Sequence, residues 1–433
     1  MPDRRTFLTT AATAGFTTNL FTGQVRGAND KIQAAFIGMG KMGRGNLGHA
    51  MKQENLVPVA VCDVYPRNLD WAVEMANKNP HGAKVRAIRD FREIIADKSI
   101  DVVNISTPDH WHAYMTVEAC KAGKDVYVEK PICVTVEEGQ LMVKAARKYN
   151  RVVQAGTMQR SQLHYQQLAK MIHDGFIGDV TFVRTGNYGY TPSKGIGNPP
   201  DSAPPAGLDW DLWLGPAPKR PFNASRFGVD PADRYFSNFR WFWDYAGGMM
   251  TDWGIHLLDI VQMAYDEVMP AVITAVGQKR YLTDNRETPD TLEAVYEYPK
   301  FIATYENRNA NDASPFLYGN TAFHGSKATL YCDRSGYKVI PIKGSDVLEM
   351  EVKSAGAGND AHWKNFIDCV KSRQKPISDI ETCFRSSATC LLANVALRSK
   401  LRLDWDPVTQ TVAQPEARKF LSYEPRAPWK IVV

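Results

Sequence analysis

The sequence of 433 residues lacks a strong net charge and a long apolar run. Its 52 Lys and Arg residues nearly balance its 47 Asp and Glu residues, so the net charge is only +5. Such a balance gives no reason to expect nucleic acid or an anionic membrane surface as a partner. No segment approaches the roughly 18 consecutive apolar residues that a transmembrane helix needs, and none is expected.

The chain also lacks any pair of cysteines with the CxxC spacing. Its seven cysteines are scattered, which is typical of buried thiols rather than of a disulfide framework. His110 and His112 lie close together, but the residues around them do not complete a metal-binding pattern. A resident metal is therefore not expected.

What the chain does contain is a dinucleotide-binding pattern between residues 34 and 63. An apolar run at 34–37 is followed by a glycine motif, a helical pattern, a second apolar run at 56–61 and an acid, Asp63. The glycine motif consists of Gly38, Met39, Gly40, Lys41, Met42 and Gly43. Strand, glycine turn, helix, strand and acid in this order favour cofactor binding over an ordinary turn in an α/β unit.

Each position of this pattern has a physical role. Gly38 permits a tight turn, Gly40 lets the backbone approach a pyrophosphate, and Gly43 lets the helix pack closely on the strand. The free N–H groups at the helix N-terminus favour phosphate binding. Asp63 is placed to bind the ribose hydroxyls and to repel a 2′-phosphate, so NAD is the expected cofactor. Arg67 softens this preference and leaves NADP possible.

Strands and helices continue to alternate up to residue 154. Strands are predicted at 34–37, 56–61, 84–88, 101–105, 125–129 and 152–154, with helices at 66–78, 90–96, 110–122 and 135–150 between them. Strands joined by helical crossovers form a doubly wound parallel sheet. Residues 31–155 are therefore predicted to be a Rossmann domain that binds its ligand at the carboxyl ends of the strands.

Two strand ends carry further candidate residues. Ser106, Thr107 and Pro108 close the predicted fourth strand, where the proline stops further pairing and the hydroxyls can face the cofactor. Glu129 and Lys130 close the fifth strand. A lysine is unusual at a buried strand end, and near a nicotinamide its ammonium group could donate to a substrate oxygen. The alternative interpretation of Ser106-Thr107-Pro108 is a plain strand-to-helix turn, and that of Lys130 is a surface lysine.

Residues 156–400 are predicted to form a second domain around an antiparallel sheet. Strand-like segments follow one another without intervening helices at 271–282, 291–298, 301–307, 321–324, 328–332 and 337–340. A further strand is expected at 179–187, after a helix at 163–174. Two helices at 360–400 are expected to pack on the first domain, and residues 401–433 form a C-terminal tail of no predicted structure.

A helix predicted at 248–265 carries Asp252 and His256, which lie one turn apart and share a face. Histidine titrates near neutrality and can accept the proton of an alcohol while hydride leaves the carbon. Asp252 can orient the imidazole or bind a neighbouring hydroxyl. A buried core histidine is the alternative interpretation for so apolar a helix.

Between residues 189 and 245 the chain is rich in proline and tryptophan, and a long loop of this kind is usually a functional surface. Exposed tryptophans such as Trp241 can stack on sugar rings, but they can equally pin the loop to the sheet or form a subunit interface. Arg160, just past the last Rossmann strand, and Asn187 are further candidate substrate contacts.

Four motifs, in this order, give the chain a resemblance to the Gfo/Idh/MocA oxidoreductases, which include glucose–fructose oxidoreductase and inositol dehydrogenase. They are the glycine motif, Ser106-Thr107-Pro108 with His112, Val128-Glu129-Lys130-Pro131, and the segment 247–259 with its D-x-G-x-H sequence. The resemblance extends from Lys31 to about Lys400. It implies a Rossmann domain followed by an α/β domain with a large, open antiparallel sheet.

The resemblance also implies roles for individual residues. The first three motifs, His112 included, would line the cofactor site, and Lys130, Asp252 and His256 would act together in catalysis. A homo-oligomer, either a dimer or a tetramer, is expected by the same analogy.

Residues 1–28 resemble a twin-arginine export signal rather than part of the fold. Arg4 and Arg5 precede a mildly apolar run of small residues. The alternative to an export signal is a disordered N-terminal tail in which the arginine pair occurs by chance. Use of the signal would take the mature protein out of the cytoplasm, to the periplasm or beyond.

Together these features predict a nicotinamide-dependent oxidoreductase acting on a carbinol carbon of a sugar, polyol or sugar derivative. Outside the cytoplasm no free nicotinamide pool reoxidises the cofactor, so it is expected to be tightly held and recycled. One alternative is an NAD-dependent glycoside hydrolase that works by transient oxidation and elimination, although that branch of the superfamily lacks the D-x-G-x-H sequence. The other is a non-catalytic sensor or interaction protein, against which the intact Lys130, Asp252 and His256 argue.

Overall fold

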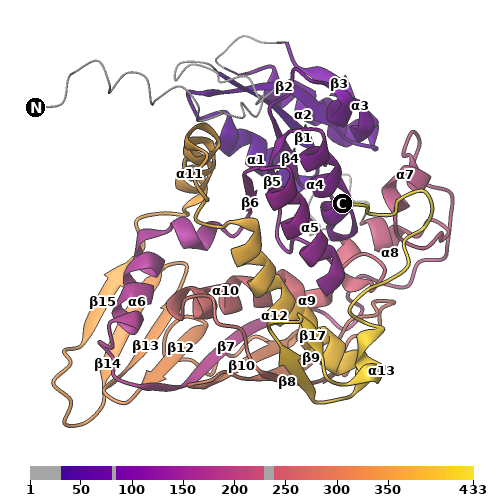
Figure 1. Ribbon diagram of the computed structural model, residues 1–433. Coiled ribbons are helices and arrows are strands. Elements are labelled where there is room, and N and C mark those ends of the chain that lie inside the picture. Colours follow the sequence, from indigo (N-terminus) through magenta and orange to yellow (C-terminus); the bar gives the residue numbers. More distant parts are fainter. Residues whose placement is uncertain (1–30, 80–83, 229–237) are drawn as a thin grey trace, which may run out of the picture. The chain divides into compact units, whose positions relative to one another are not determined.

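The computed structural model describes residues 31–79, 84–228 and 238–433. The predicted export signal at 1–28 lies outside the described residues. Residues Lys31–Val433 belong to one compact unit, which contains two β-sheets and the helices between them (Figure 1). None of the helices in the described part of the chain combines the length and the apolarity that crossing a membrane requires.

The first sheet confirms the predicted Rossmann domain. Its six strands are β1 (Ile32–Ile37), β2 (Leu56–Cys62), β3 (Arg86–Ile88), β4 (Val102–Ile105), β5 (Asp125–Val128) and β6 (Val153–Ala155). They are all parallel and lie in the order β3-β2-β1-β4-β5-β6. The crossovers are α1 (Lys41–Ala50), α2 (Pro66–Ala76), α3 (Phe91–Ala96), α4 (His112–Lys121) and α5 (Val136–Lys148). The strand order reverses at β1 and β4, which places a ligand crevice at their carboxyl ends.

Local signals begin two of these helices. The Asp90 carboxylate accepts a hydrogen bond from the Arg92 N–H at 2.9 Å and caps α3. Before α5, the Thr135 hydroxyl accepts from the Glu138 N–H at 3.3 Å, and the Glu138 carboxylate accepts from the Thr135 N–H at 3.1 Å. This reciprocal pair satisfies two N–H groups that the helix itself leaves without partners.

The second sheet is mixed but mostly antiparallel, as predicted. Its strands are β7 (Val180–Tyr190), β8 (Val272–Gln278), β9 (Thr291–Glu297), β10 (Ile302–Arg308), β11 (Ala310–Asn311), β12 (Thr321–Gly325), β13 (Ala328–Asp333), β14 (Gly336–Pro341), β15 (Met350–Lys353), β16 (Leu403–Asp406) and β17 (Thr411–Val412). The order along the sheet is β15-β14-β13-β12-β7-β10-β9-β8-β16-β17, with β11 paired to β7. Among the described strands of this sheet, β7 and β10 alone pair in parallel. The C-terminal tail, for which nothing was predicted, supplies β16, β17 and α13 (Pro415–Arg418).

Helices cover one face of this sheet and join it to the Rossmann domain. α6 (Leu163–His173), α10 (Gly254–Ala264) and α12 (Ile380–Ser399) lie between the sheet and the first domain (Figure 1). α11 (Asn359–Ser372) packs on the Rossmann sheet, where the ring of Trp363 stacks on Tyr127 with 4.3 Å between ring centres. The expectation that the helices at 360–400 pack on the first domain is confirmed.

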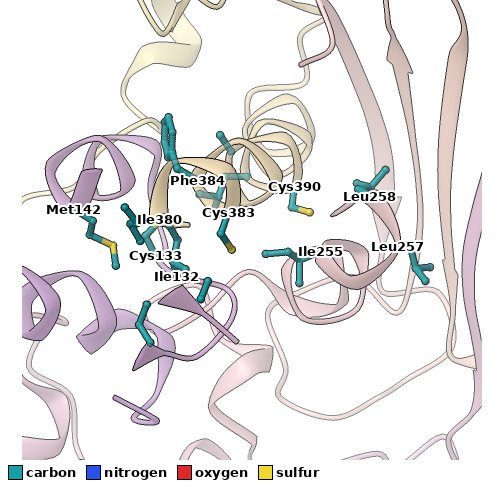
Figure 2. Packing of buried hydrophobic residues seen from close by; sticks show 14 of the residues in the cluster. Ile132, Cys133, Met142, Ile255, Leu257, Leu258, Ile380, Cys383, Phe384 and Cys390 are labelled. Carbon is teal, nitrogen blue, oxygen red and sulfur yellow. The ribbon is translucent and has the colours of Figure 1, made fainter. Parts of the chain in front are cut away.

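One cluster of buried apolar residues runs across both domains. Figure 2 shows Cys133 and Met142 of the first domain facing Phe384 of α12, while Ile255 of α10 lies near Cys383 on the other side of that helix. α12 is therefore buried on nearly all sides. This core holds the Rossmann strand ends at a fixed place relative to α10.

One close contact in this core depends on a glycine of α5, Gly139. A β-carbon on Gly139 would lie 2.4 Å from a ring carbon of Phe384 and 3.1 Å from the sulfur of Cys133. Both neighbours are fully buried and cannot move aside easily. Glycine is therefore required here by the approach of α12, although it is a poor helix former.

Because of this contact, replacing Gly139 by alanine is predicted to change stability in the direction opposite to that of an ordinary Gly→Ala change in a helix. An alanine normally stabilises a helix interior relative to glycine by about 0.5–1 kcal/mol, but Gly139→Ala should destabilise the protein by about 1–3 kcal/mol because it overpacks the core. Gly45→Ala in α1 is the matched control, since nothing lies within 4 Å of its β-carbon position. Urea unfolding of both variants measures the difference; a Gly139→Ala protein as stable as the control would contradict the prediction.

Candidate active site

The glycine motif forms the turn between β1 and α1. Gly38 has φ +84°, which side chains rarely adopt, and a β-carbon on it would lie 2.6 Å from a backbone nitrogen of the turn after β4. A β-carbon on Gly43 would lie 1.9 Å from the carbonyl oxygen of Gly38, so only glycine lets α1 approach the turn this closely. The space around Gly40 is open. Gly40, Lys41 and Met42 line a pocket of about 530 Å³.

Asp63, directly after β2, is bound to the same turn. Its carboxylate accepts hydrogen bonds from the N–H of Met39 at 2.7 Å and from the N–H of Tyr65 at 2.8 Å. Burial raises the pKa of Asp63, and these hydrogen bonds oppose the shift. The carboxylate lines the pocket, as predicted for a ribose contact. Met39 does not line the pocket, because its side chain is fully buried in the core. It contributes to the site through its backbone N–H, which holds Asp63.

Two guanidinium groups lie beside this acid. Those of Arg67 and Arg44 each lie 4.7 Å from the ring centre of Trp71, on which they stack. Arg67 lines the pocket together with Asp63. The acid favours a ribose with free hydroxyls and the cation favours a 2′-phosphate, so the two opposing determinants indicated by the sequence face one pocket.

The turn after β4 lines the next part of the pocket through Ser106, Thr107 and Pro108. The Ser106 hydroxyl donates to the side-chain oxygen of Asn104 at 2.9 Å and accepts from the side-chain nitrogen of Asn46 at 3.0 Å. The Thr107 hydroxyl oxygen is buried and has no hydrogen-bond partner among the described residues. These positions agree with the predicted cofactor contacts.

His112 and Glu129 support the wall of the pocket that they line. The ring nitrogens of His112 lie 2.7 Å from the carbonyl oxygen of Pro131 and 2.9 Å from that of Thr107. Burial lowers the pKa of His112 to about 4, so the neutral ring donates to only one of these two oxygens. Glu129 accepts from the side chain of Asn46 at 2.8 Å. His112 thus lies between the segments that follow β4 and β5, and Glu129 ties the end of β5 to α1.

Lys130 reaches from the end of β5 to the second domain. Its ammonium group donates to the Asp252 carboxylate at 2.8 Å and to the Asp252 carbonyl oxygen at 3.0 Å. The side chains are 13% and 5% exposed, respectively. This pair joins the strand end of one domain to a helix end of the other.

The helix predicted at 248–265 is broken at Trp253. α9 (Gly248–Asp252) ends there and α10 begins at Gly254. In an unbroken helix the Asp252 carbonyl would accept from the N–H of His256; here Lys130 binds that carbonyl, and the His256 N–H donates to the Trp253 carbonyl at 3.0 Å. The prediction of one continuous helix was therefore wrong, although Asp252 and His256 do line the same pocket.

Asp252 is an ionised carboxylate held by two cations. The Arg240 guanidinium donates to it at 3.2 Å, in addition to Lys130. Burial alone would raise the pKa of Asp252, but Arg240 and Lys130 outweigh it and hold that pKa below its usual range. The other carboxylate oxygen has no partner among the described residues.

His256 is a neutral imidazole in the pocket wall. Burial lowers its pKa well below the ordinary value, and the nearby charges of Lys130 and Arg334 lower it further. Its side chain is almost fully buried, and its Nδ1 atom has no hydrogen-bond partner among the described residues. A neutral ring of this kind can accept a proton from a bound hydroxyl.

The pocket also contains residues that the sequence did not indicate: Asp109, Trp253, Arg240 and Arg334. Asp109 directly follows the Ser106-Thr107-Pro108 motif, and Trp253 directly follows Asp252. Their positions next to these motifs could have identified them as site residues from the sequence. Arg240 precedes Trp241 in a short 3-10 helix (Asn238–Trp241), and Arg334 lies in the turn between β13 and β14. Nothing local marks either arginine, because only the tertiary fold brings it to the pocket.

Three predicted substrate contacts lie away from the pocket. Arg160 is buried in an ion-pair network with Asp259 at 2.8 Å and Glu267 at 2.7 Å, so its position contradicts a substrate role. Asn187 lies in β7 and donates to the side chain of Asn307 at 3.0 Å. Trp241 is buried in the aromatic cluster that pins the long loop. For Trp241, the interpretation as a loop anchor is correct and the interpretation as an exposed stacking surface is wrong.

No group of three or more His, Cys, Asp or Glu side chains within residues 31–79, 84–228 and 238–433 has the arrangement of a metal site. The donors gathered in the pocket are instead amide, hydroxyl, guanidinium and ammonium groups. Such donors suit a phosphorylated, ribose-containing ligand at one end and a hydroxylated ligand at the other.

Two family models match adjoining parts of the chain. The Gfo/Idh/MocA model described as "Oxidoreductase family, NAD-binding Rossmann fold" matches residues 32–157. The model described as "Oxidoreductase family, C-terminal alpha/beta domain" matches residues 161–431. The second match alone spans more than half of the chain.

Curated relatives match over about a third of the chain. Inositol 2-dehydrogenase of Salmonella typhimurium is 31% identical over 159 residues, which are 36% of this chain and 46% of that protein. A glycosyl hydrolase family 109 protein of Shewanella pealeana is 27% identical over 158 residues, 35% of this chain and 34% of that protein. In both cases the match spans less than half the length of the relative.

The fold is also found in solved structures. The structure of the WlbA dehydrogenase of Bordetella pertussis, in complex with NADH and UDP-GlcNAcA, superposes with a TM-score of 0.64. The superposition covers 87% of this chain and 99% of that one at 18% sequence identity. At that identity the likeness establishes a shared two-domain architecture.

The buried Asp109 side chain predicts a pH dependence of stability. Burial raises its pKa from 3.8 to about 8, against the opposing effect of Arg240. Between these two values the folded protein keeps a proton that the unfolded chain loses, so this group costs stability progressively as the pH rises from about 4 to about 8.

Replacement of Asp109 by asparagine removes the titration while keeping the shape of the neutral form. In urea unfolding experiments, the wild type should therefore lose stability relative to Asp109→Asn as the pH rises through that window, with a constant difference above it. A difference that does not change with pH would contradict the raised pKa.

Proposed function

Because the chain belongs to the Gfo/Idh/MocA oxidoreductase family, we propose that it transfers hydride between a nicotinamide cofactor and a carbinol carbon of a sugar, polyol or sugar derivative. One observation carries the proposal. The neutral His256 and the Lys130–Asp252 pair line the same pocket as the glycine turn and Asp63. A proton acceptor, a fixed cation and a dinucleotide-binding turn are the parts that such a reaction needs.

The residues of the pocket fit the cofactor of the family. The backbone around Gly40 is open to a ligand, and Asp63 faces the place of the ribose. When bound there, a nicotinamide supplies or accepts the hydride. We propose NAD as the preferred form because a carboxylate at Asp63 repels a 2′-phosphate, with NADP as the second choice through Arg67.

His256 and Lys130 have separate roles in the proposed reaction. During oxidation His256 takes the proton of the substrate hydroxyl, and during reduction it returns that proton to the forming alcohol. Lys130 donates a hydrogen bond to the same oxygen and stabilises the negative charge that develops on it. Asp252 keeps the lysine in position through its carboxylate and its carbonyl.

The glycoside hydrolase alternative is supported by one finding, the similarity to a glycosyl hydrolase family 109 protein over nearly the same length as to inositol 2-dehydrogenase. In that reaction a transient ketone labilises the glycosidic bond, and the cofactor ends in its starting state. The intact D-x-G-x-H sequence supports simple hydride transfer as the first choice. Release of a free aglycone from an aryl glycoside, without net change in the cofactor, would favour the hydrolase.

We also propose that the protein is exported in its folded state with its cofactor bound. The arginine pair and small-residue run in residues 1–28 support export, and the lack of a free nicotinamide pool outside the cytoplasm supports internal recycling. A homo-oligomer is proposed by analogy with the family.

Removal of His256 tests the assigned chemistry. His256→Ala should lower kcat by about a hundred- to ten-thousandfold, because proton transfer loses its acceptor, while NAD binding and the melting temperature stay close to those of the wild type. His173→Ala, an exposed histidine of α6, is the control and should keep full activity. Steady-state kinetics and NAD titration measure both effects; a His256→Ala enzyme of normal kcat would remove the residue from the mechanism.

Nucleotide analysis tests the resident cofactor. Protein purified from the periplasm or culture supernatant, then denatured, should release close to one nicotinamide dinucleotide per chain, identified by mass spectrometry. Gly43→Ala should carry much less, because its β-carbon would clash with the Gly38 carbonyl oxygen at 1.9 Å and distort the turn. Wild-type protein that is empty, or that stays in the cytoplasm, would refute internal recycling and leave an ordinary exchanging dehydrogenase.

A further inference from the structure

Arg334 is a fixed cation at the substrate end of the pocket. It lies in the turn between β13 and β14 and lines the pocket together with Lys130 and His256. Its Nε atom donates to the side-chain oxygen of Gln159 at 3.1 Å, and the nitrogen of the same amide donates to the His256 carbonyl at 3.1 Å. Gln159 is itself almost fully buried, so it ties the guanidinium to the backbone of the proposed base.

An aromatic ring fixes the other side of this guanidinium. The Arg334 Cζ atom lies 4.9 Å from the ring centre of Trp253. The same ring lies 5.8 Å from the ring of His256, with which it makes an edge contact. Arg334 and His256 are therefore neighbours of one indole.

Arg334 lacks an anionic partner in the described part of the chain. No carboxylate of residues 31–79, 84–228 or 238–433 forms an ion pair with it. The ionised Asp252 is bound to Lys130 and Arg240, and Asp109 is kept protonated at neutral pH by burial. The Nη atoms of Arg334, which form the planar end of the guanidinium, are thus left for a ligand.

The guanidinium of Arg334 is accessible to a ligand. Arg334 is an exposed residue of the pocket wall, and the partial burial of its side chain lowers its pKa. A carboxylate in the plane of the Nη atoms forms two parallel, charge-assisted hydrogen bonds with such a group. A neutral sugar would leave this charge without a counter-ion.

On the basis of the proposed function, we propose that the substrate is an acidic sugar, a uronic or aldonic acid, whose carboxylate pairs with the Nη atoms of Arg334. His256 then faces a hydroxyl on another carbon of the same sugar. The stacking of Arg334 on Trp253 and its hydrogen bond to Gln159 orient the guanidinium before the substrate binds, so the carboxylate sets which hydroxyl reaches the base.

Binding and turnover are measured separately to test this assignment. D-glucuronate and D-galacturonate are compared with D-glucose and D-galactose, first by the thermal stabilisation of the NAD-loaded protein and then by nicotinamide absorbance. We expect the uronates to bind at least about tenfold more tightly than their neutral counterparts. In Arg334→Gln the preference for uronates over neutral sugars should disappear, and Arg334→Lys should restore part of it. Arg402→Gln is the control, because Arg402 is exposed and does not line the pocket.

The outcomes separate this inference from the proposed function. Uronate binding that depends on Arg334 without any hydride transfer would support the acidic ligand and refute the reaction. Hydride transfer with neutral sugars alone, or an unchanged preference in Arg334→Gln, would support the reaction and overturn the acidic substrate. Selection of D-glucose 6-phosphate over D-glucuronate would also overturn it, because the anion would then be a phosphate. The absence of any uronate binding would likewise overturn the acidic substrate.

Discussion

The contact between Lys130 and Asp252 is the constraint on which the site depends. It joins the end of a Rossmann strand to the second domain through both a carboxylate and a backbone carbonyl. Because the lysine occupies that carbonyl, the helix stops at Asp252 and a new one starts at Gly254. His256 thereby lies in the first turn of α10, facing the pocket. This hydrogen-bonded pair thus lies at the helix break that positions the proposed base, and together with Arg240 it keeps the aspartate ionised.

The two domains act as one body because their cores are shared. α11 closes one face of the Rossmann sheet through Trp363, and α12 fills the space between α5 and α10 on the other (Figures 1 and 2). An active site assembled from both domains needs such stiffness, since the proposed proton and hydride transfers require reacting groups held within a fraction of an ångström. The buried pair of Arg160 and Asp259 adds to this support, although the sequence suggested a different role for that arginine.

Local sequence was sufficient for the parts of the site that local geometry builds. The glycine turn, Asp63 and the two strand ends follow from spacing, because a strand, a tight turn and a helix leave few places for these side chains. The break at Trp253 was not predictable in this way, since Lys130 lies far away in the sequence. Arg334 is similar: it occupies an ordinary hairpin turn, and its partner Gln159 is 175 residues distant. Charges that meet only through tertiary folding give no periodic signal.

The packing of α11 on the first domain affects how the protein is made. Residues 31–155 leave the ribosome long before Trp363, so the face of the sheet around Tyr127 has no cover during most of translation. The native core of the cofactor-binding half is therefore complete only after α11 has been synthesised, near the end of translation.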